Sequence, residues 1–389
     1  MAQPTVAVVG AGSMGSMTMW QLANAGAKVL GFEQYGIAHD RSAAGGESRM
    51  FRTAYMEGAN YVPLLQRAEA LWRALELETG AQLLTMTGGL MIGGHSSEKI
   101  HNVLQSIHEF DLPHEVLDPE QASRRFPQHS FDRDEAIILD KAAGMLRPEY
   151  AVFTAVSRAV ELGAELHTYT PVLGVESSGD KVKVATPKQN YEVDYAVITT
   201  GPWFDKLVPS AAGTVTPRRI LMSWFASKNP AAFKQDRFPV FARLSDEADI
   251  FGIPTLDGTL TKVASIATFG DVEDADHLDH NTDHKDFEEL NSIVNRTLNG
   301  LATTPSRISV HMDGYTPTGT PIVDRSPESD RVFCMGGFSG HGFKLAPVMG
   351  QLATEYIYGN TSHLPREHMT FATPERLGSS HAAEQGDTT

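Results

Sequence analysis

The chain opens with a short apolar run that leads into a glycine-rich turn. Residues 5–9 (TVAVV) have the composition of a buried strand, and Gly10–Gly15 (GAGSMG) follow as a GxGxxG motif. Residues 16–25 are compatible with a helix, and a second apolar run at 28–32 ends at Glu33. This order predicts the strand, turn, helix and strand of a dinucleotide-binding unit, with Glu33 placed to accept hydrogen bonds from a ribose hydroxyl.

Each position of the turn has a physical role in such a unit. Gly10 permits the tight turn out of the strand, Gly12 lets the backbone approach a pyrophosphate, and Gly15 allows the helix to pack closely on the strand. The helix begins near Ser13 and Met14, where unpaired N–H groups and the positive end of the helix dipole favour phosphate. The motif predicts a dinucleotide but does not distinguish between dinucleotides.

The remaining periodicity predicts an α/β plus α+β fold. Helical spacing predicts helices over 61–79, 98–109, 148–163 and 347–358. Strand-like apolar runs occur at 88–93, 165–169, 172–176, 181–185, 191–193, 195–200 and 331–337, and in a second group at 220–226, 240–242, 250–253, 261–266 and 308–311. The second group alternates with turn clusters, which is typical of a mostly antiparallel sheet.

We therefore expect a Rossmann-type nucleotide domain that is split in sequence, and a substrate domain built on a mostly antiparallel sheet. The nucleotide domain is assigned to residues 1–84, 144–212 and 315–372, and the substrate domain to residues 85–143 and 213–314. The polar, small-residue-rich tail at 373–389 is expected to be disordered.

Composition narrows the functional classes. The 389 residues carry a formal net charge of −16, which argues against nucleic acid as a partner. No apolar stretch reaches the roughly eighteen residues of a membrane span, so we expect a cytoplasmic monomer that does not bind a membrane. The single cysteine, Cys334, excludes an intramolecular disulfide, and the fifteen histidines show no metal-ligand spacing. The acid-flanked histidines of 277–284 are interpreted as a solvated surface loop.

Three segments carry a resemblance to a known family. They are GAGSMGS at 10–16, SRMFRTAYMEG at 48–58 and GFSGHGFK at 337–344. Together with the three-part layout, they make residues 5–365 resemble the monomeric sarcosine oxidase family of flavoenzymes. This group includes N-methyltryptophan oxidase and, more distantly, the fructosyl amino acid oxidases. The resemblance implies FAD, oxidation of a secondary amine of an α-amino acid, hydrolysis of the imine, and transfer of the electrons to O2 to give H2O2.

The resemblance also implies roles for positively charged residues. Arg52 and Lys344 match positions that hold the substrate carboxylate, and Arg49 matches a position beside the flavin. A planar guanidinium and an ammonium suit a carboxylate. The alternative for both arginines is an ordinary ion pair with Glu47 or Glu57. Further cofactor contacts are implied at Gln34, Arg41, Ser42, Ser48, Val172, Gly201, Trp203, Gly337, Ser339, Gly340, His341 and Gly342.

Lys262 is the second lysine to which the resemblance gives a role. It lies in an otherwise apolar, strand-like segment, where a lysine is unfavourable unless it is paired or functional. The family has a lysine at the matching position above the flavin, where a fixed cation favours the first electron transfer to O2. The alternative is a lysine on an edge strand that faces water.

The chain departs from the family at the residue that usually links the flavin covalently. Alignment on Thr316-Pro317 puts His311 where most members have the linking cysteine. Cys334 lies in an apolar run and is interpreted as a small core residue. We therefore expect non-covalent FAD, with a histidyl link through His311 as the less favoured alternative.

The substrate pocket departs from sarcosine oxidase as well. A tyrosine and a histidine of that pocket correspond to Phe251 and Ile266, and a second tyrosine corresponds to Asp313. These changes leave N-methyl and N-fructosyl amino acids open as substrates, because a new carboxylate suits a polar or cationic substituent. The alternative for Asp313 is a pair with Lys262 or Arg52.

Three other functions remain open at this point. A dehydrogenase of the same fold would pass electrons to an acceptor other than O2. A non-catalytic FAD-binding protein would use the same nucleotide unit. An NAD(P)-dependent dehydrogenase is the weakest of the three, because the motif at 337–344 has no role in it.

Overall fold

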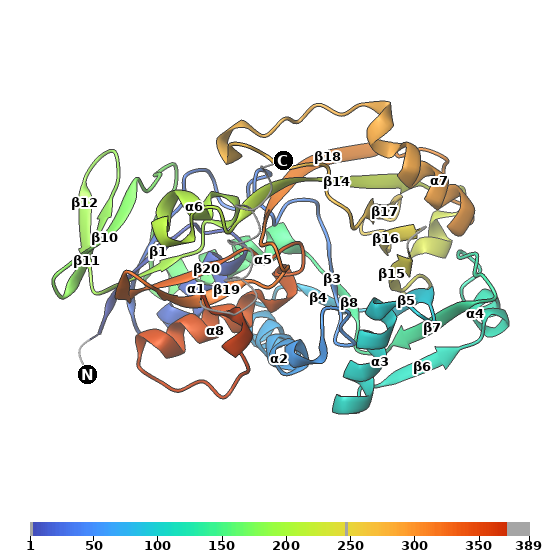
Figure 1. The fold of residues 1–389 in the computed structure, drawn as a ribbon, viewed down its shortest axis with the longest axis horizontal. Helices are drawn as coiled ribbons and strands as arrows, with labels where there is room; N and C mark the ends of the chain where they lie inside the picture. The colour runs from blue at the N-terminus through green and yellow to red at the C-terminus, as the bar shows by residue number, and fades with distance from the viewer. Residues whose placement is uncertain (1–2, 246–247, 372–389) are drawn as a thin grey trace, which may run out of the picture.

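The computed structural model describes residues 3–245 and 248–371 and has a mixed α/β architecture built on two large sheets (Figure 1). One sheet is mainly parallel and the other largely antiparallel, which confirms the predicted fold class. The domain boundaries given above stay a prediction, and the predicted tail at 373–389 lies outside the described residues.

The six-stranded sheet contains the predicted nucleotide unit. Its order is β19–β20–β13–β1–β2–β9, and only β19 runs antiparallel to its neighbour. The three central strands are buried over most of their length, as expected of a parallel sheet covered on both faces. The strands are β1 (Thr5–Val9), β2 (Lys28–Phe32), β9 (Glu165–His167), β13 (Tyr195–Ile198), β19 (Ile322–Ser326) and β20 (Ser329–Gly336).

Four helices share one apolar core beside this sheet. They are α1 (Ser13–Asn24), α2 (Val62–Thr79), α5 (Pro148–Glu161) and α8 (Ala346–Ile357). Helix α1 contacts both α5 and α8, and α2 contacts α8. The indole rings of Trp20 and Trp72 are buried in this core. Helix α2 ends at Gly80, whose φ of 73° is a left-handed conformation that glycine adopts without strain.

The eight-stranded sheet forms the other large part of the molecule, on the right of Figure 1. Its order is β18–β14–β17–β16–β15–β5–β7–β6, and only β15 and β5 pair in parallel. Its strands are β5 (Gly89–Gly94), β6 (His114–Leu117), β7 (Glu135–Asp140), β14 (Thr216–Ala226), β15 (Val240–Ser245), β16 (Ala248–Ile253), β17 (Leu260–Ser265) and β18 (Arg307–Tyr315). Three helices accompany it: α3 (Glu98–Phe110), α4 (Pro119–Arg125) and α7 (Glu288–Thr297).

Two small sheets complete the architecture. One joins β3 (Arg49–Phe51), β8 (Gly144–Leu146) and β4 (Leu84–Met86), so Arg49 starts a strand that pairs with β8. The other joins β10 (Gly174–Ser178), β11 (Lys181–Ala185) and β12 (Asn190–Val193).

The predicted elements differ from the structure in several places: β3, β4 and β19 were not predicted, and two further differences have a clear cause. The sequence pattern assigned no element to residues 111–146, which form β6, α4, β7 and β8. Strand β6 alternates between exposed and half-buried residues, so it gives a weak apolar pattern. Strand β14 begins at Thr216, four residues before the predicted start at Ile220, because Arg218 and Arg219 interrupt the apolar run while their backbones still pair with β18.

Candidate active site

A large cavity of about 1480 Å³, including its open mouth, runs along the carboxyl ends of β1, β2 and β13. This is where the crevice of an open α/β sheet binds ligands. Fourteen of the predicted site residues line it: Gly10, Gly12, Ser13, Met14, Glu33, Gln34, Ser42, Arg49, Val172, Gly201, Trp203, Asp313, Gly340 and Gly342. Other residues of the lining belong to none of the three motifs, among them His39, Thr170, Thr200, Lys206 and Asp276.

The glycines of the β1–α1 turn occupy three different environments. Gly10 has a φ of 88°, and a Cβ there would lie 2.8 Å from the Thr199 carbonyl oxygen. A Cβ on Gly15 would lie 1.8 Å from the Gly10 carbonyl oxygen, so α1 packs directly on the turn. A Cβ on Gly12 would meet no atom within 4 Å. Gly12 therefore leaves open the space into which a dinucleotide backbone would fit.

A matched pair of alanine substitutions separates these roles. Gly15→Ala should destabilise the fold by roughly 1–3 kcal/mol or more, because the neighbouring backbone atom cannot move away. Gly12→Ala should leave the melting temperature of the FAD-free protein nearly unchanged and weaken FAD binding. Thermal denaturation and FAD titration measure the two effects. Equal loss of stability in both variants would contradict this division of roles.

The Glu33 carboxylate is buried and holds the turn. It accepts hydrogen bonds from the N–H groups of Ala11 (3.0 Å) and Tyr35 (2.9 Å), and His39 Nε2 lies 3.5 Å away. A carboxylate has about four acceptor positions, so one remains for a ribose hydroxyl.

Hydrogen bonds from two side chains hold the loop at residues 40–48. One is Arg49, directly after the loop, and the other is Lys262 of β17. Arg49 donates to the carbonyls of Ala43 (2.7 Å), Gly45 (2.5 Å) and Ser48 (2.8 Å). Lys262 donates to the carbonyls of Gly46 and Ser48, both at 2.9 Å. Arg49 therefore forms neither of the carboxylate pairs given above as its alternative. Arg49 lines the cavity, whereas Lys262 does not.

Lys262 does not face water. Its side chain lies on β17, between β14 and β16, and only 1% of the residue is exposed. Its ammonium lies 5.6 Å from the ring centre of Trp224 and 5.7 Å from that of Phe251. Burial, followed by the nearby positive charge of Arg49, holds the pKa of Lys262 well below its ordinary value. The edge-strand interpretation is therefore wrong.

His311 is buried on β18 against the same loop. Its Nδ1 lies 2.9 Å from the Asp40 carbonyl oxygen, and its Nε2 lies 2.7 Å from Ser309 Oγ. Burial and the charge of Arg49 lower its pKa to about 4, so the ring is neutral at pH 7. Cys334 is fully buried in strand β20, as expected of a core residue.

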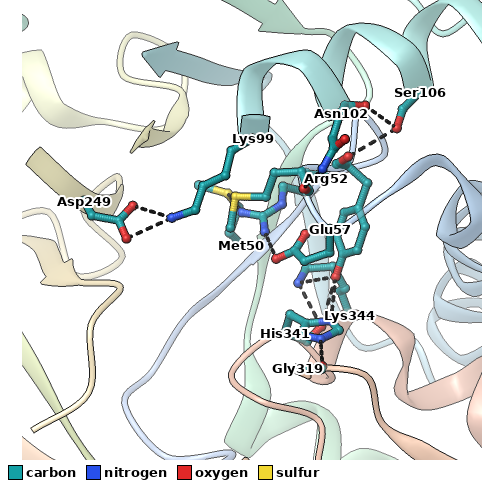
Figure 2. Close-up of polar contacts among 12 residues, drawn as sticks. Met50, Arg52, Glu57, Lys99, Asn102, Ser106, Asp249, Gly319, His341 and Lys344 are labelled. Atoms are coloured by element: carbon teal, nitrogen blue, oxygen red, sulfur yellow. Dashed lines mark hydrogen bonds and ion pairs between the residues drawn. The ribbon is translucent and has the colours of Figure 1, made fainter. Parts of the chain in front are cut away.

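Arg52 and Lys344 come together around one tyrosine (Figure 2). The guanidinium of Arg52 and the ammonium of Lys344 each lie 5.2 Å from the ring centre of Tyr55. Arg52 Nη2 donates to Glu57 Oε1 at 2.7 Å, so Arg52 forms one of the ion pairs given above as alternatives, with its Nε left over. Lys344 Nζ donates to the His341 carbonyl at 2.9 Å.

This cluster has unused hydrogen-bonding capacity. Arg52 Nε and Glu57 Oε2 are both buried without a hydrogen-bond partner among the described residues. Burial, followed by the charge of Arg52, lowers the pKa of Lys344 to about 7. Burial alone would raise the pKa of Glu57, but Arg52, His341 and Lys344 together hold it below its ordinary value. A buried carboxylate ligand would meet two cations and one unpaired donor here.

Asp313 pairs with neither Lys262 nor Arg52, which corrects that alternative. Its carboxylate accepts from the N–H groups of Gly314 (2.8 Å) and Gly340 (2.9 Å), so it holds the 337–344 loop at the cavity wall. Burial raises its pKa to about 6, against the lowering effect of these two N–H groups and of Arg49.

Replacement of this carboxyl should change how stability depends on pH. A folded-state pKa raised to about 6 means that the folded protein binds more protons than the unfolded chain between about pH 4 and 6, so Asp313 lowers stability as the pH rises through this range. Relative to the wild type, Asp313→Asn should gain stability from pH 4.5 to 7.5, by at most roughly 3 kcal/mol at about 1.4 kcal/mol per pKa unit. Urea denaturation at several pH values tests this. A difference that does not vary with pH would contradict it.

Phe251 and Ile266 pack in one apolar cluster with Met50 and Met56, next to Arg52. An ion pair between Lys99 and Asp249 (2.9 Å) ties α3 to β16 beside this cluster (Figure 2). Phe251 and Ile266 were predicted from the sequence, whereas the packing of Met50 and Met56 and the ion pair were not. The available signal was that Met50 and Arg52 lie two residues apart, in and just after β3.

Twelve predicted site residues are not part of the cavity lining: Gly15, Arg41, Ser48, Arg52, Phe251, Lys262, Ile266, His311, Gly337, Ser339, His341 and Lys344. Arg41 stacks over Tyr35 at 4.7 Å, and Ser339 Oγ accepts from Thr316 N–H and donates to Gly337 O. His341 bonds Tyr55 and the Gly319 carbonyl. These residues shape the loops that line the cavity.

The residues present fit an FAD molecule. The open space beside Gly12, the start of α1 without a side-chain cap, and buried Glu33 suit the nucleotide half. Arg49, Gly340 and Gly342 offer positive charge and close backbone at the far side of the cavity. Among residues 3–245 and 248–371, no three histidine, cysteine or acidic side chains are grouped to hold a metal ion.

The fold and the cavity define a flavoprotein oxidoreductase, and comparison with known proteins gives the family. Residues 5–356 match the FAD dependent oxidoreductase family, and the chain belongs to it. Within the described residues, no helix is both long enough and apolar enough to cross a membrane.

The chain is sarcosine oxidase-like in sequence. It is 33% identical to monomeric sarcosine oxidase of Streptomyces avermitilis over 364 residues, which cover 92% of this chain and 94% of the relative. It is 30% identical to N-methyl-L-tryptophan oxidase of Yersinia pestis over 363 residues, 91% of this chain and 95% of the relative.

Solved structures share the fold at lower identity. NikD, described as an unusual amino acid oxidase, superposes with a TM-score of 0.83 at 18% identity, covering 95% of this chain and 98% of its own. Amadoriase I of Aspergillus fumigatus, a fructosyl amine oxidoreductase, superposes with a TM-score of 0.78 at 17% identity, covering 97% and 91%. These likenesses show the fold alone.

Proposed function

We propose that the protein is an oxidase of N-substituted α-amino acids whose substituent is a methyl or a fructosyl group. The products would be the dealkylated amino acid, an aldehyde or glucosone, and H2O2. The observation that carries the proposal is the convergence of two buried cations, Arg52 and Lys344, on one tyrosine ring, with Arg52 Nε still unpaired. Such a site favours a ligand with a carboxylate.

The surroundings of these cations support an amino-acid substrate. The apolar cluster of Met50, Phe251 and Ile266 offers a wall for an alkyl or side-chain group. Glu57 Oε2 is an unpaired acceptor close to Arg52, and an amine N–H is a group that could satisfy it. The sequence relatives act, by their names, on amino acids that carry N-methyl groups.

FAD, when bound, would supply the chemistry: it would take one hydride equivalent (two electrons and a proton) from the CH–N unit of the substrate and pass the two electrons to O2. Arg52 and Lys344 would hold the substrate carboxylate and so orient the amine. The amine would react in its neutral form. Lys262 would hold a positive charge where O2 is reduced.

We infer that the FAD is held without a covalent bond. Cys334 is buried in strand β20, and both ring nitrogens of His311 are within hydrogen-bonding distance of protein oxygens. Acid precipitation of the purified protein should leave the yellow colour in the supernatant. Colour in the pellet, lost from a His311→Ala variant, would establish the histidyl link instead.

Product analysis tests the reaction. In air, sarcosine, other N-methyl α-amino acids and N-fructosyl α-amino acids should be screened for the free amino acid and for H2O2. Formaldehyde identifies the N-methyl class, and glucosone identifies the N-fructosyl class. Amine oxidation that occurs only with an artificial electron acceptor, without H2O2, would favour the dehydrogenase alternative.

A further inference from the structure

The segment between β17 and α7 makes a long excursion from the eight-stranded sheet. In Figure 1 it is the gold-to-orange chain that runs above β14 and β18. Both ends of the excursion are held by β14: Arg218 pairs with Asp271 at 3.0 Å, and Arg219 Nε donates to the Asp279 carbonyl at 3.2 Å. A loop with close ends and a projecting tip is a type that often carries function.

The tip of this segment, residues 274–278, reaches the turn that follows β13. Asp276 accepts hydrogen bonds from Trp203 Nε1 and from Lys206 Nζ, both at 2.6 Å. Lys206 Nζ also donates to Asp274 at 2.8 Å. Four charged or polar groups from two distant parts of the chain therefore form one network.

An apolar contact supports the same junction. Trp203 and Ala275 pack in one cluster with Met312 of β18, and Tyr35 and Leu278 pack against it. The ring centre of Tyr35 lies 6.1 Å from that of Trp203. Tyr35 follows the end of β2, so the tip bridges the segments after β2 and β13 that border the cavity.

The same residues form part of the cavity wall. Trp203, Lys206 and Asp276 line the cavity together with Gly12 and Glu33. We propose that residues 274–278 are a clasp on the cofactor: the network of Asp276, Lys206 and Trp203 belongs to the FAD site and slows FAD release. The proposal rests on the non-covalent FAD proposed above, and it does not depend on which amine is oxidised.

The exposure of the network argues against a purely structural role. The side chains of Lys206, Asp274 and Asp276 are 47%, 41% and 44% exposed. Ion pairs at such exposure contribute little to global stability. Their effect is to fix the positions of an indole and an ammonium at the cavity. A change in FAD release without a change in melting temperature is therefore the signature of the clasp.

The rate of FAD release from the holoenzyme tests this proposal. The rise in fluorescence of free FAD after dilution gives the rate. Asp276→Asn and Lys206→Met should each raise it by roughly twofold to fivefold, the effect of losing an exposed ion pair at the cavity wall. Trp203→Phe keeps an aromatic ring in the apolar cluster but is smaller and lacks the N–H donor, so it should also raise the rate. Added salt should speed release from the wild type and have less effect on Lys206→Met.

Asp330→Asn is the matched control, because it removes an exposed ion pair with Arg325 that lies outside both the cavity and residues 274–278. It should release FAD at the wild-type rate. The proposal is overturned if Asp330→Asn speeds release as much as Asp276→Asn does, or if neither Lys206→Met nor Trp203→Phe differs from the wild type. FAD that remains bound to acid-precipitated protein overturns it as well.

Discussion

Lys262→Met is expected to slow reoxidation by O2 by roughly 10²–10³-fold, the usual loss when one preorganised charge-stabilising group is removed. Reduction by substrate should change by only a few-fold. The reason is geometric: the ammonium is fixed by two carbonyls at 2.9 Å and buried between aromatic rings, so it needs no reorganisation when negative charge develops on O2. Methionine keeps the length and the apolar stem of the side chain.

Stopped-flow spectroscopy measures the rate of flavin reduction by substrate and the rate of reoxidation by O2 separately. Lys141→Met is a suitable control, because Lys141 is a half-exposed lysine at the end of β7 that pairs with Glu115 on the surface. It should leave both half-reactions unchanged. If Lys262→Met slowed both half-reactions equally, Lys262 would act on the substrate or the fold rather than on O2.

Arg52→Met is expected to lower kcat/KM by roughly 10²–10³-fold, within the range for truncating one partner of a buried, hydrogen-bonded charge pair. The variant loses the guanidinium that would hold the carboxylate and also leaves Glu57 unpaired. Lys344→Met should have a similar effect on kcat/KM. FAD content shows whether each variant still binds its cofactor.

Comparing an amino acid with its uncharged amide shows whether Arg52 and Lys344 bind the substrate carboxylate or only stabilise the fold. The amide of the same amino acid lacks the carboxylate charge, so it should lose much less from either substitution. Arg124→Met, which removes an exposed pair on α4, should change nothing. Equal losses for the acid and the amide would mean that Arg52 and Lys344 support the fold rather than the substrate.

The pH dependence of carboxylate binding follows from the pKa of Lys344. Because burial and Arg52 lower its pKa to about 7, its positive charge is present below pH 7 and is lost as the pH rises through that value. Binding of a simple carboxylate such as acetate, followed by the visible spectrum of the flavin, should weaken above about pH 7. Lys344→Met should bind acetate weakly, with this pH step absent.

The nucleotide unit could be predicted from the sequence because its signals are local. The turn glycines, the helix and Glu33 lie within about thirty residues, and each occupies the environment its position predicts. The low-polarity setting of Lys262 also predicted a functional or paired lysine. Residues 111–146 were not assigned, because β6 is partly exposed, and α4 and β8 are only seven and three residues long, so none of the three gives a clear period.

Contacts between segments that lie far apart in the sequence could not be predicted from it. Asp313 reaches Gly340 because β18 and the 337–344 loop meet at the cavity, which no spacing indicates. The acid-rich stretch around His277 was interpreted as a solvated loop, and His277 is indeed largely exposed. Its neighbour Asp276 nevertheless lines the cavity, because the loop is held at both ends by β14.

Anaerobic reduction is the most direct test of the central claim, that the chain oxidises N-substituted α-amino acids with FAD. The oxidised protein is mixed without O2 with sarcosine, longer N-methyl amino acids and N-fructosyl amino acids. The account predicts that at least one compound bleaches the visible flavin absorption and that readmitted O2 restores it with release of H2O2. A spectrum that no compound bleaches, in protein that retains its FAD, would contradict the claim.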